Sequence, residues 1–165
     1  MNTAPLPRLN ETHQLELAFD GAPVVQVRLV RDVAHSFQPR IQVHSPEDVA
    51  RVVAPYFDEC AAEEFLTVNL NTANVVINIV HLTRGGLAAS IVEPRMVFQA
   101  AILSNAAAIV CCHNHPSGNP EPSREDIRIT RQLVEAGKIL GIPIHDHLII
   151  TGRAYTSFAE RGLMN

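Results

Sequence analysis

Alternation of apolar and polar residues predicts most of the strands in this chain. Residues alternate on both sides of the turn signal Asp20-Gly21, which predicts a β-hairpin over residues 15–29. The stretch 106–112 is apolar throughout, which indicates a strand buried on both faces of a sheet. Further strands are expected where apolar and β-branched residues gather, at 65–70, 75–82, 88–92, 144–150 and 155–158.

Three segments carry helix signals. Ser45 can cap a helix and the Pro-Glu-Asp that follows suits its first turn, so a helix is predicted from 46 to about 56. Pro94 opens a second helix that ends near 105, and Ser123 begins a third that Gly141 ends. Because strands and helices alternate along the chain, the sequence predicts the α/β class, with a mixed β-sheet flanked by helices.

The composition narrows the class of protein. A chain of 165 residues with 47% hydrophobic residues suits one domain with a sizeable core, which we place at 45–165 behind an N-terminal tail and hairpin extension at 1–44. The net charge of −4 counts against a strongly basic nucleic-acid-binding surface. Three cysteines without a C-x-x-C pair, no secretory signal and no apolar run of membrane-spanning length predict a cytoplasmic protein that does not enter a membrane.

The candidate chemistry lies between the apolar strand and the third helix. His113 and His115 are two residues apart, so on extended backbone their side chains point to the same side. A loop rich in Pro and Gly lets the chain turn back, so that Asp126 could bring a carboxylate to the same point. Two His and one Asp leave one tetrahedral position open, which is the pattern of a catalytic zinc site. The alternative reading of Ser123 and Asp126 is an ordinary capping box.

The complete pattern at 113–126 is His-x-His, seven residues of which Pro116 is the first, Ser, two residues and Asp. It resembles the JAMM metalloproteins, and the residues around it, at 105–118 and 135–142, resemble the RadC-like branch of that family. The resemblance implies the JAB/MPN (cytidine-deaminase-like) architecture and zinc-dependent cleavage of a peptide or isopeptide bond. The substrate would be a peptide or protein, with ubiquitin-like conjugates among the candidates. RadC-like proteins usually carry a helical module ahead of this domain, and the chain resembles the short stand-alone members that lack it.

The resemblance also implies a role for each motif residue. His113, His115 and Asp126 would bind Zn²⁺, with a water in the fourth position whose pKa the metal lowers toward neutrality. Ser123 would donate a hydrogen bond to the oxygen that becomes negative in the tetrahedral intermediate.

The family also uses an upstream glutamate that holds the water and shuttles its proton. Glu63 matches that position, two residues before Phe65. Glu64 remains the alternative. Because neighbouring residues in a strand face opposite sides, only one of the two can point at the metal.

Other histidines and cysteines could mislead. His145 and His147 form a second His-x-His and are expected to share a face, with a structural or pocket-lining role favoured over contact with a metal ligand. Cys111 should face the same way as His113, so a thiolate ligand is conceivable, but the apolar run favours buried, inert side chains for Cys111 and Cys112. The scattered histidines are interpreted as surface or structural residues: His13, His35, His44 and His81.

Two other function classes compete with a hydrolase. One is a DNA-repair-associated or nucleic-acid-interacting protein with zinc in a non-proteolytic role, against which the net charge of −4 and the missing helical module count. The other is a binding module with structural zinc, against which the open coordination position counts.

Overall fold

The computed structural model describes residues 41–58, 60–83 and 92–165. The hairpin predicted over 15–29 lies outside the described residues. So does most of the strand predicted at 88–92; Val92 itself is buried and belongs to no strand. No helix among the described residues is both long and apolar enough to cross a bilayer.

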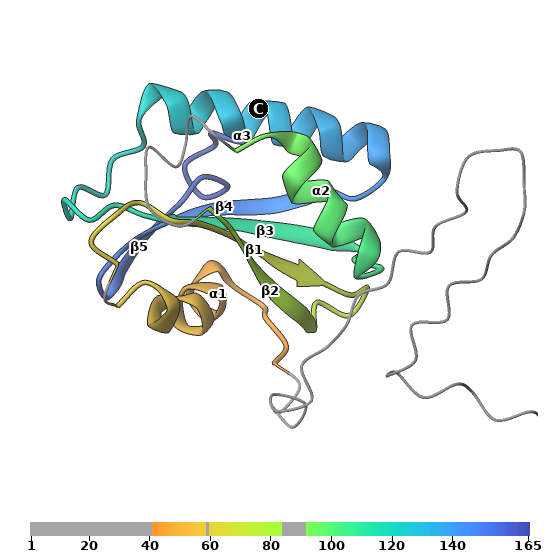
Figure 1. Ribbon diagram of the computed structural model, residues 1–165, viewed down its shortest axis with the longest axis horizontal. Helices are drawn as coiled ribbons and strands as arrows, with labels where there is room; N and C mark the ends of the chain where they lie inside the picture. The colour runs from red at the N-terminus through yellow and green to blue at the C-terminus, as the bar shows by residue number, and fades with distance from the viewer. Residues whose placement is uncertain (1–40, 59, 84–91) are drawn as a thin grey trace, which may run out of the picture.

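One mixed sheet forms the centre of the domain (Figure 1). Its strand order is β2-β1-β3-β4-β5, and β3 and β4 are parallel whereas the other neighbours are antiparallel. The α/β class with a mixed sheet is therefore confirmed, and it agrees with a JAB/MPN fold. The strand bounds are β1 Phe65–Leu70, β2 Val76–Thr83, β3 Ala108–Asn114, β4 Ile144–Thr151 and β5 Ala154–Ser157.

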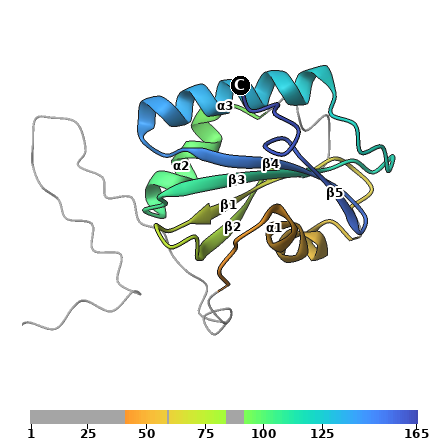
Figure 2. The ribbon, with the colours of Figure 1, turned by 180° about the vertical axis from the view of Figure 1, so that it is seen from behind.

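Helices cover both faces of the sheet. Helix α1 (Pro46–Val53), continued by the 3₁₀ turn η2 (Ala54–Tyr56), lies on one face, and α2 (Pro94–Leu103) and α3 (Arg124–Leu140) lie on the other (Figures 1 and 2). The predicted helix starts are confirmed: Ser45 caps α1 and Ser123 caps α3. Gly141 ends α3 in the left-handed conformation that glycine adopts without strain.

Successive side chains of the central strands pack alternately into two separate hydrophobic cores, one on each face of the sheet. On the α1 face, Leu66 and Cys112 pack with residues of β4 and with Val49 and Val53 of α1. On the other face, Phe65 and the odd-numbered residues of β3 pack against α2 and α3. This alternation follows from the two-residue period of a strand.

The strand predicted at 106–112 is displaced toward its C-terminal end. Asn105 takes a positive φ of 56° as the chain leaves α2, so β3 starts at Ala108. At its other end β3 keeps pairing with Phe65 of β1 and with β4 as far as Asn114. His113 and Asn114, predicted to begin the loop, therefore lie on the strand.

The prediction that His145 and His147 share a face is wrong. The pairing of β3 with β4 shifts between Ile109 and Val110, whose partners are Ile144 and Asp146, so His145 is an extra residue in the ladder. This bulge changes the alternation of β4. His145 is consequently exposed, whereas His147 is fully buried.

Candidate metal centre

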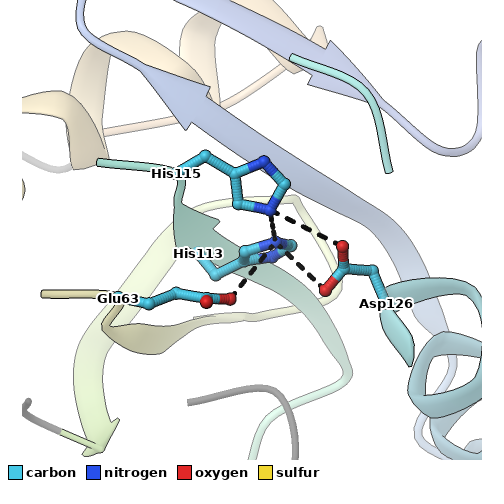
Figure 3. Close-up of side chains that lie close together, drawn as sticks. All are labelled: Glu63, His113, His115 and Asp126. Carbon is cyan, nitrogen blue, oxygen red and sulfur yellow. Dashed lines mark hydrogen bonds and ion pairs between the residues drawn. The ribbon is translucent and has the colours of Figure 1, made fainter. Parts of the chain in front are cut away.

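Four side chains from separate parts of the chain converge at one end of the sheet (Figure 3). Glu63 lies two residues before the start of β1, His113 lies near the end of β3, His115 follows that strand, and Asp126 lies in the first turn of α3. One ligand atom of each residue lies within 4.8 Å of all the others. This group could hold a metal ion, and it contains every residue that the sequence proposed for metal binding.

The distances within the cluster suit a tetrahedral zinc site. Bonds of 2.0–2.1 Å to a central Zn²⁺ place neighbouring ligand atoms about 3.3 Å apart. His113 Nε2 is 3.0 Å from His115 Nε2 and 3.4 Å from Asp126 Oδ1. His115 Nε2 is 3.5 Å from Asp126 Oδ2. A contact of 3.0 Å between two imidazole nitrogens also requires a proton or a metal ion between them.

Glu63 lies farther out than the other three. Its Oε1 is 3.9 Å from His113 Nε2, and its side chain is 27% exposed, against 1% for His113 and 2% for Asp126. His115 is 13% exposed, so Glu63 is the most exposed member of the cluster, as suits a group that exchanges protons with water.

Burial and neighbouring charges shift the pKa values of the four cluster residues in different directions. Burial lowers the pKa of His113 to about 4, so this imidazole is neutral at pH 7 and offers a lone pair. Burial followed by the charge of Asp126 raises the pKa of Glu63. For Asp126 burial acts upward, but hydrogen bonding with His115 and Ser123 and the nearby His113 bring its pKa well below the usual range. A hydrogen bond with Asp126 raises the pKa of His115.

The loop after β3 orients His115. Its Nδ1 lies 2.7 Å from the carbonyl oxygen of Asn119, which can only accept, so Nδ1 carries a hydrogen. Gly118 lets the loop return, because it takes a positive φ of 74° and its N–H donates to the His115 carbonyl. The neutral ring thus presents Nε2 to the cluster, as metal ligation requires.

The structure separates the two glutamates. Glu64 Oε2 lies 3.4 Å from Nδ1 of His81, away from the metal cluster, whereas Glu63 points into it. Asn114, between the two histidines, fixes this arrangement. Its Oδ1 accepts from the N–H of Glu64 at 2.7 Å and its Nδ2 donates to the carbonyl of Ala62 at 3.1 Å. Both peptides that flank Glu63 are therefore held by one buried side chain.

Ser123 and Asp126 form the capping box that the sequence offered as the plain alternative. Ser123 Oγ accepts from the N–H of Asp126 at 3.1 Å, and Asp126 Oδ2 accepts from the N–H of Ser123 at 2.7 Å. The two readings are compatible. Capping uses a lone pair of the hydroxyl and leaves its hydrogen to donate elsewhere. Ser123 is exposed and lines the cleft beside the cluster.

That cleft has a volume of about 690 Å³ and opens to solvent. Glu63 and His115 lie at its wall, and most of its remaining lining residues are exposed. Its ionisable lining side chains, among the part of the chain that the structure describes, are Glu63, His115 and Glu121, without a Lys or Arg. Such a surface is poorly suited to the phosphate backbone of a nucleic acid.

Other predicted residues take distinct places. Cys111 and Cys112 are fully buried, and burial raises the pKa of each thiol, so both are inert as predicted. His147 contacts His113, which was the less favoured interpretation. Sequence reasoning missed the role of Asn114. A signal existed, because Asn114 lies between His113 and His115.

Comparison with known proteins agrees with this geometry. A family model described as RadC-like JAB domain matches residues 43–163, a range that includes the whole cluster. A UPF0758 protein of Salinibacter ruber is 60% identical over 92% of this chain and 63% of its own length. UPF0758 protein STH371 of Symbiobacterium thermophilum is 46% identical over 76% of this chain and 53% of its own length.

A UPF0758 protein of Methanosarcina acetivorans is 38% identical over 99% of this chain and 72% of its own length. The chain thus spans between about half and three quarters of the length of these relatives.

Proposed function

Because the chain belongs to the family of RadC-like JAB domains, we propose that it is a zinc-dependent hydrolase of the JAMM type that cleaves a peptide or isopeptide bond. One observation carries this proposal. Glu63 stands beside His113, His115 and Asp126 on the wall of an open cleft, with Ser123 on the same cleft. Three ligands, a base and a hydroxyl donor are the parts that metal-assisted amide hydrolysis needs.

His113, His115 and Asp126 would hold the zinc. When bound, zinc lowers the pKa of a water molecule toward 7 and polarises a carbonyl oxygen. The remaining proton transfers fall to Glu63. Its carboxylate takes a proton from the attacking water and gives it to the nitrogen that leaves as an amine.

Ser123 would stabilise the developing negative charge. Its hydroxyl hydrogen, left available by the capping bond, can donate to the substrate carbonyl oxygen as that oxygen becomes negative. The hydroxyl is held in place by the same N–H of Asp126 that starts α3, so it is oriented before substrate arrives. The open cleft and its lack of lining Lys or Arg within the described residues favour an extended polypeptide as the substrate.

The test combines metal analysis with a peptide-cleavage screen. We expect one zinc per chain and cleavage of members of a peptide library, read by mass spectrometry. Glu63→Gln should keep the zinc and lose cleavage, whereas Glu64→Gln, the matched neighbour that contacts His81, should keep both. Carefully purified protein that contains no zinc and takes none up would refute the proposal.

A further inference from the structure

His113 faces the cluster with one ring nitrogen and a buried polar chain with the other. Its Nδ1 lies 2.8 Å from Nε2 of His147. Nδ1 of His147 lies 2.6 Å from Oγ1 of Thr130, and that oxygen lies 2.6 Å from the carbonyl oxygen of Asp126. All four residues are at most 1% exposed, so water does not compete for these contacts.

The direction of each hydrogen bond follows from the last contact. A carbonyl oxygen can only accept, so the single hydroxyl hydrogen of Thr130 points at Asp126. Thr130 Oγ1 can then only accept from Nδ1 of His147, which must carry a hydrogen. Neutral His147 is left with a lone pair on Nε2, and this lone pair accepts from Nδ1 of His113. Neutral His113 therefore has its lone pair on Nε2, facing the cluster.

We infer that Thr130 and His147 are positioning residues that hold His113 in its metal-binding tautomer. The inference rests on the metal binding in the proposed function. His115 reaches the same tautomer through one carbonyl, that of Asn119, whereas His113 depends on a second imidazole whose own tautomer could be either. Thr130 selects one tautomer of His147. The Asp126 carbonyl accepts the hydroxyl hydrogen of Thr130, so Thr130 Oγ1 can only accept from His147 Nδ1.

Aromatic packing fixes the orientation of the His113 and His147 rings. Phe65 stacks on His113 with ring planes 2° apart, and Phe158 stacks on His147 with centroids 4.7 Å apart. A ring held between neighbours in this way cannot turn over to exchange its two nitrogens without disturbing the core. The hydrogen-bond order is thus imposed on rings whose orientation is already fixed.

The test compares Thr130→Val with Thr130→Ser. Valine keeps the volume of threonine but loses the acceptor for His147 Nδ1, so His147 should move its hydrogen to Nε2 and donate to His113, which then presents N–H to the cluster. We expect zinc affinity, measured by competition with a chromophoric chelator, to fall about 10- to 100-fold in Thr130→Val. Thr130→Ser, which keeps the hydroxyl, should remain within about threefold of wild type.

Thr67→Val is the matched control. Thr67 is a buried threonine whose hydroxyl makes no hydrogen bond in the structure, so its loss should leave zinc affinity unchanged. ¹⁵N NMR of the imidazole rings supplies a readout that destabilisation alone would not move. It should place hydrogens on Nδ1 of His147 in metal-free wild type and on Nε2 in Thr130→Val.

Unchanged zinc affinity in Thr130→Val, or a hydrogen on His147 Nε2 in wild type, would overturn the inference. A wild-type protein that binds no zinc would refute the proposed function instead, and the ring spectra of the metal-free protein would still decide the tautomer.

Discussion

The two faces of the central sheet use the same strands for different purposes. The α1 face is lined by apolar side chains such as Leu66, Val68 and Leu148. The opposite face begins as an apolar core under α2 and α3, but at one end it buries polar groups, among them His113 and His147. Burying polar groups requires a partner for each. The α1 face can therefore contribute mainly to stability, whereas the opposite face also holds polar side chains that must keep specific hydrogen-bond partners.

We call the face under α2 and α3 the functional face. The largest effect on metal binding is expected when a polar group is removed from it. His113→Ala deletes one of three proposed ligands, so zinc affinity should fall by about 100-fold or more, while the α1 core stays intact. Zinc content and circular dichroism measure the two effects. The exposed His44→Ala is the control and should keep one zinc per chain. Full zinc occupancy in His113→Ala would contradict the assignment.

The reciprocal change is made on the α1 face. Leu66 is fully buried among apolar neighbours, so Leu66→Ala should lower the free energy of unfolding by about 2–5 kcal/mol. The metal cluster takes no side chain from that face of β1, so zinc affinity of the folded protein should stay within about threefold of wild type. Urea unfolding and chelator competition test this. A loss of zinc as large as in His113→Ala would show that the faces are not independent.

Acidification from pH 7 to pH 5 should destabilise the protein through the buried histidines of the functional face. The pKa of His113 is about 4 in the folded metal-free protein, below the value of about 6.5 in an unfolded chain, so the unfolded state binds more protons between these values. Stability is thus greatest above pH 6.5 and is lost as the pH falls toward 4. His113 alone accounts for about 2 kcal/mol between pH 7 and 5.

Neighbouring histidines modify this slope. The buried His147, whose pKa is also lowered, adds to the loss, whereas His115, whose pKa is raised, offsets part of it. Chemical unfolding of the metal-free protein at several pH values measures the sum. Leu66→Ala should lower the curve at every pH without altering its slope. A metal-free wild type as stable at pH 5 as at pH 7 would be inconsistent with neutral, buried His113.

A local steric effect tests the apolar part of the functional face. Gly137 lies where α3 meets the following loop, and a Cβ there would lie 2.7 Å from the carbonyl oxygen of Ile142 and 3.4 Å from the ring of Phe98. Alanine usually stabilises an open helix position by about 1 kcal/mol. Here Gly137→Ala should instead destabilise by about 1–3 kcal/mol. Thermal unfolding measures this, with the exposed Gln132→Ala expected to change little.

Local pattern was sufficient for much of the fold. The strand at 65–70 and the helix starts at Ser45 and Ser123 could be predicted because alternation and capping depend on near neighbours in sequence. The end of β3 could not, because His113 and Asn114 are held in the sheet by partners in β1 and β4.

The candidate site divides in the same way. His113, His115 and Asp126 follow from spacing in one stretch of the chain. The choice between Glu63 and Glu64 needed the hydrogen bonds of Asn114, which lies some fifty residues away. The prediction that His145 and His147 share a face failed because a bulge at His145, set by pairing with β3, changes the alternation of β4.

The double use of Asp126 limits what evolution can place at that position. A capping box commonly has Glu or Gln at this position, so the start of α3 alone would tolerate Glu. Here one carboxylate accepts from the N–H of Ser123 while its two oxygens lie 3.4 and 3.5 Å from Nε2 of His113 and Nε2 of His115. A side chain one methylene longer would move the carboxylate away from one of these partners. The contacts of its carboxylate with both histidines therefore favour Asp at position 126, although the residue stands where a helix-capping preference would otherwise decide.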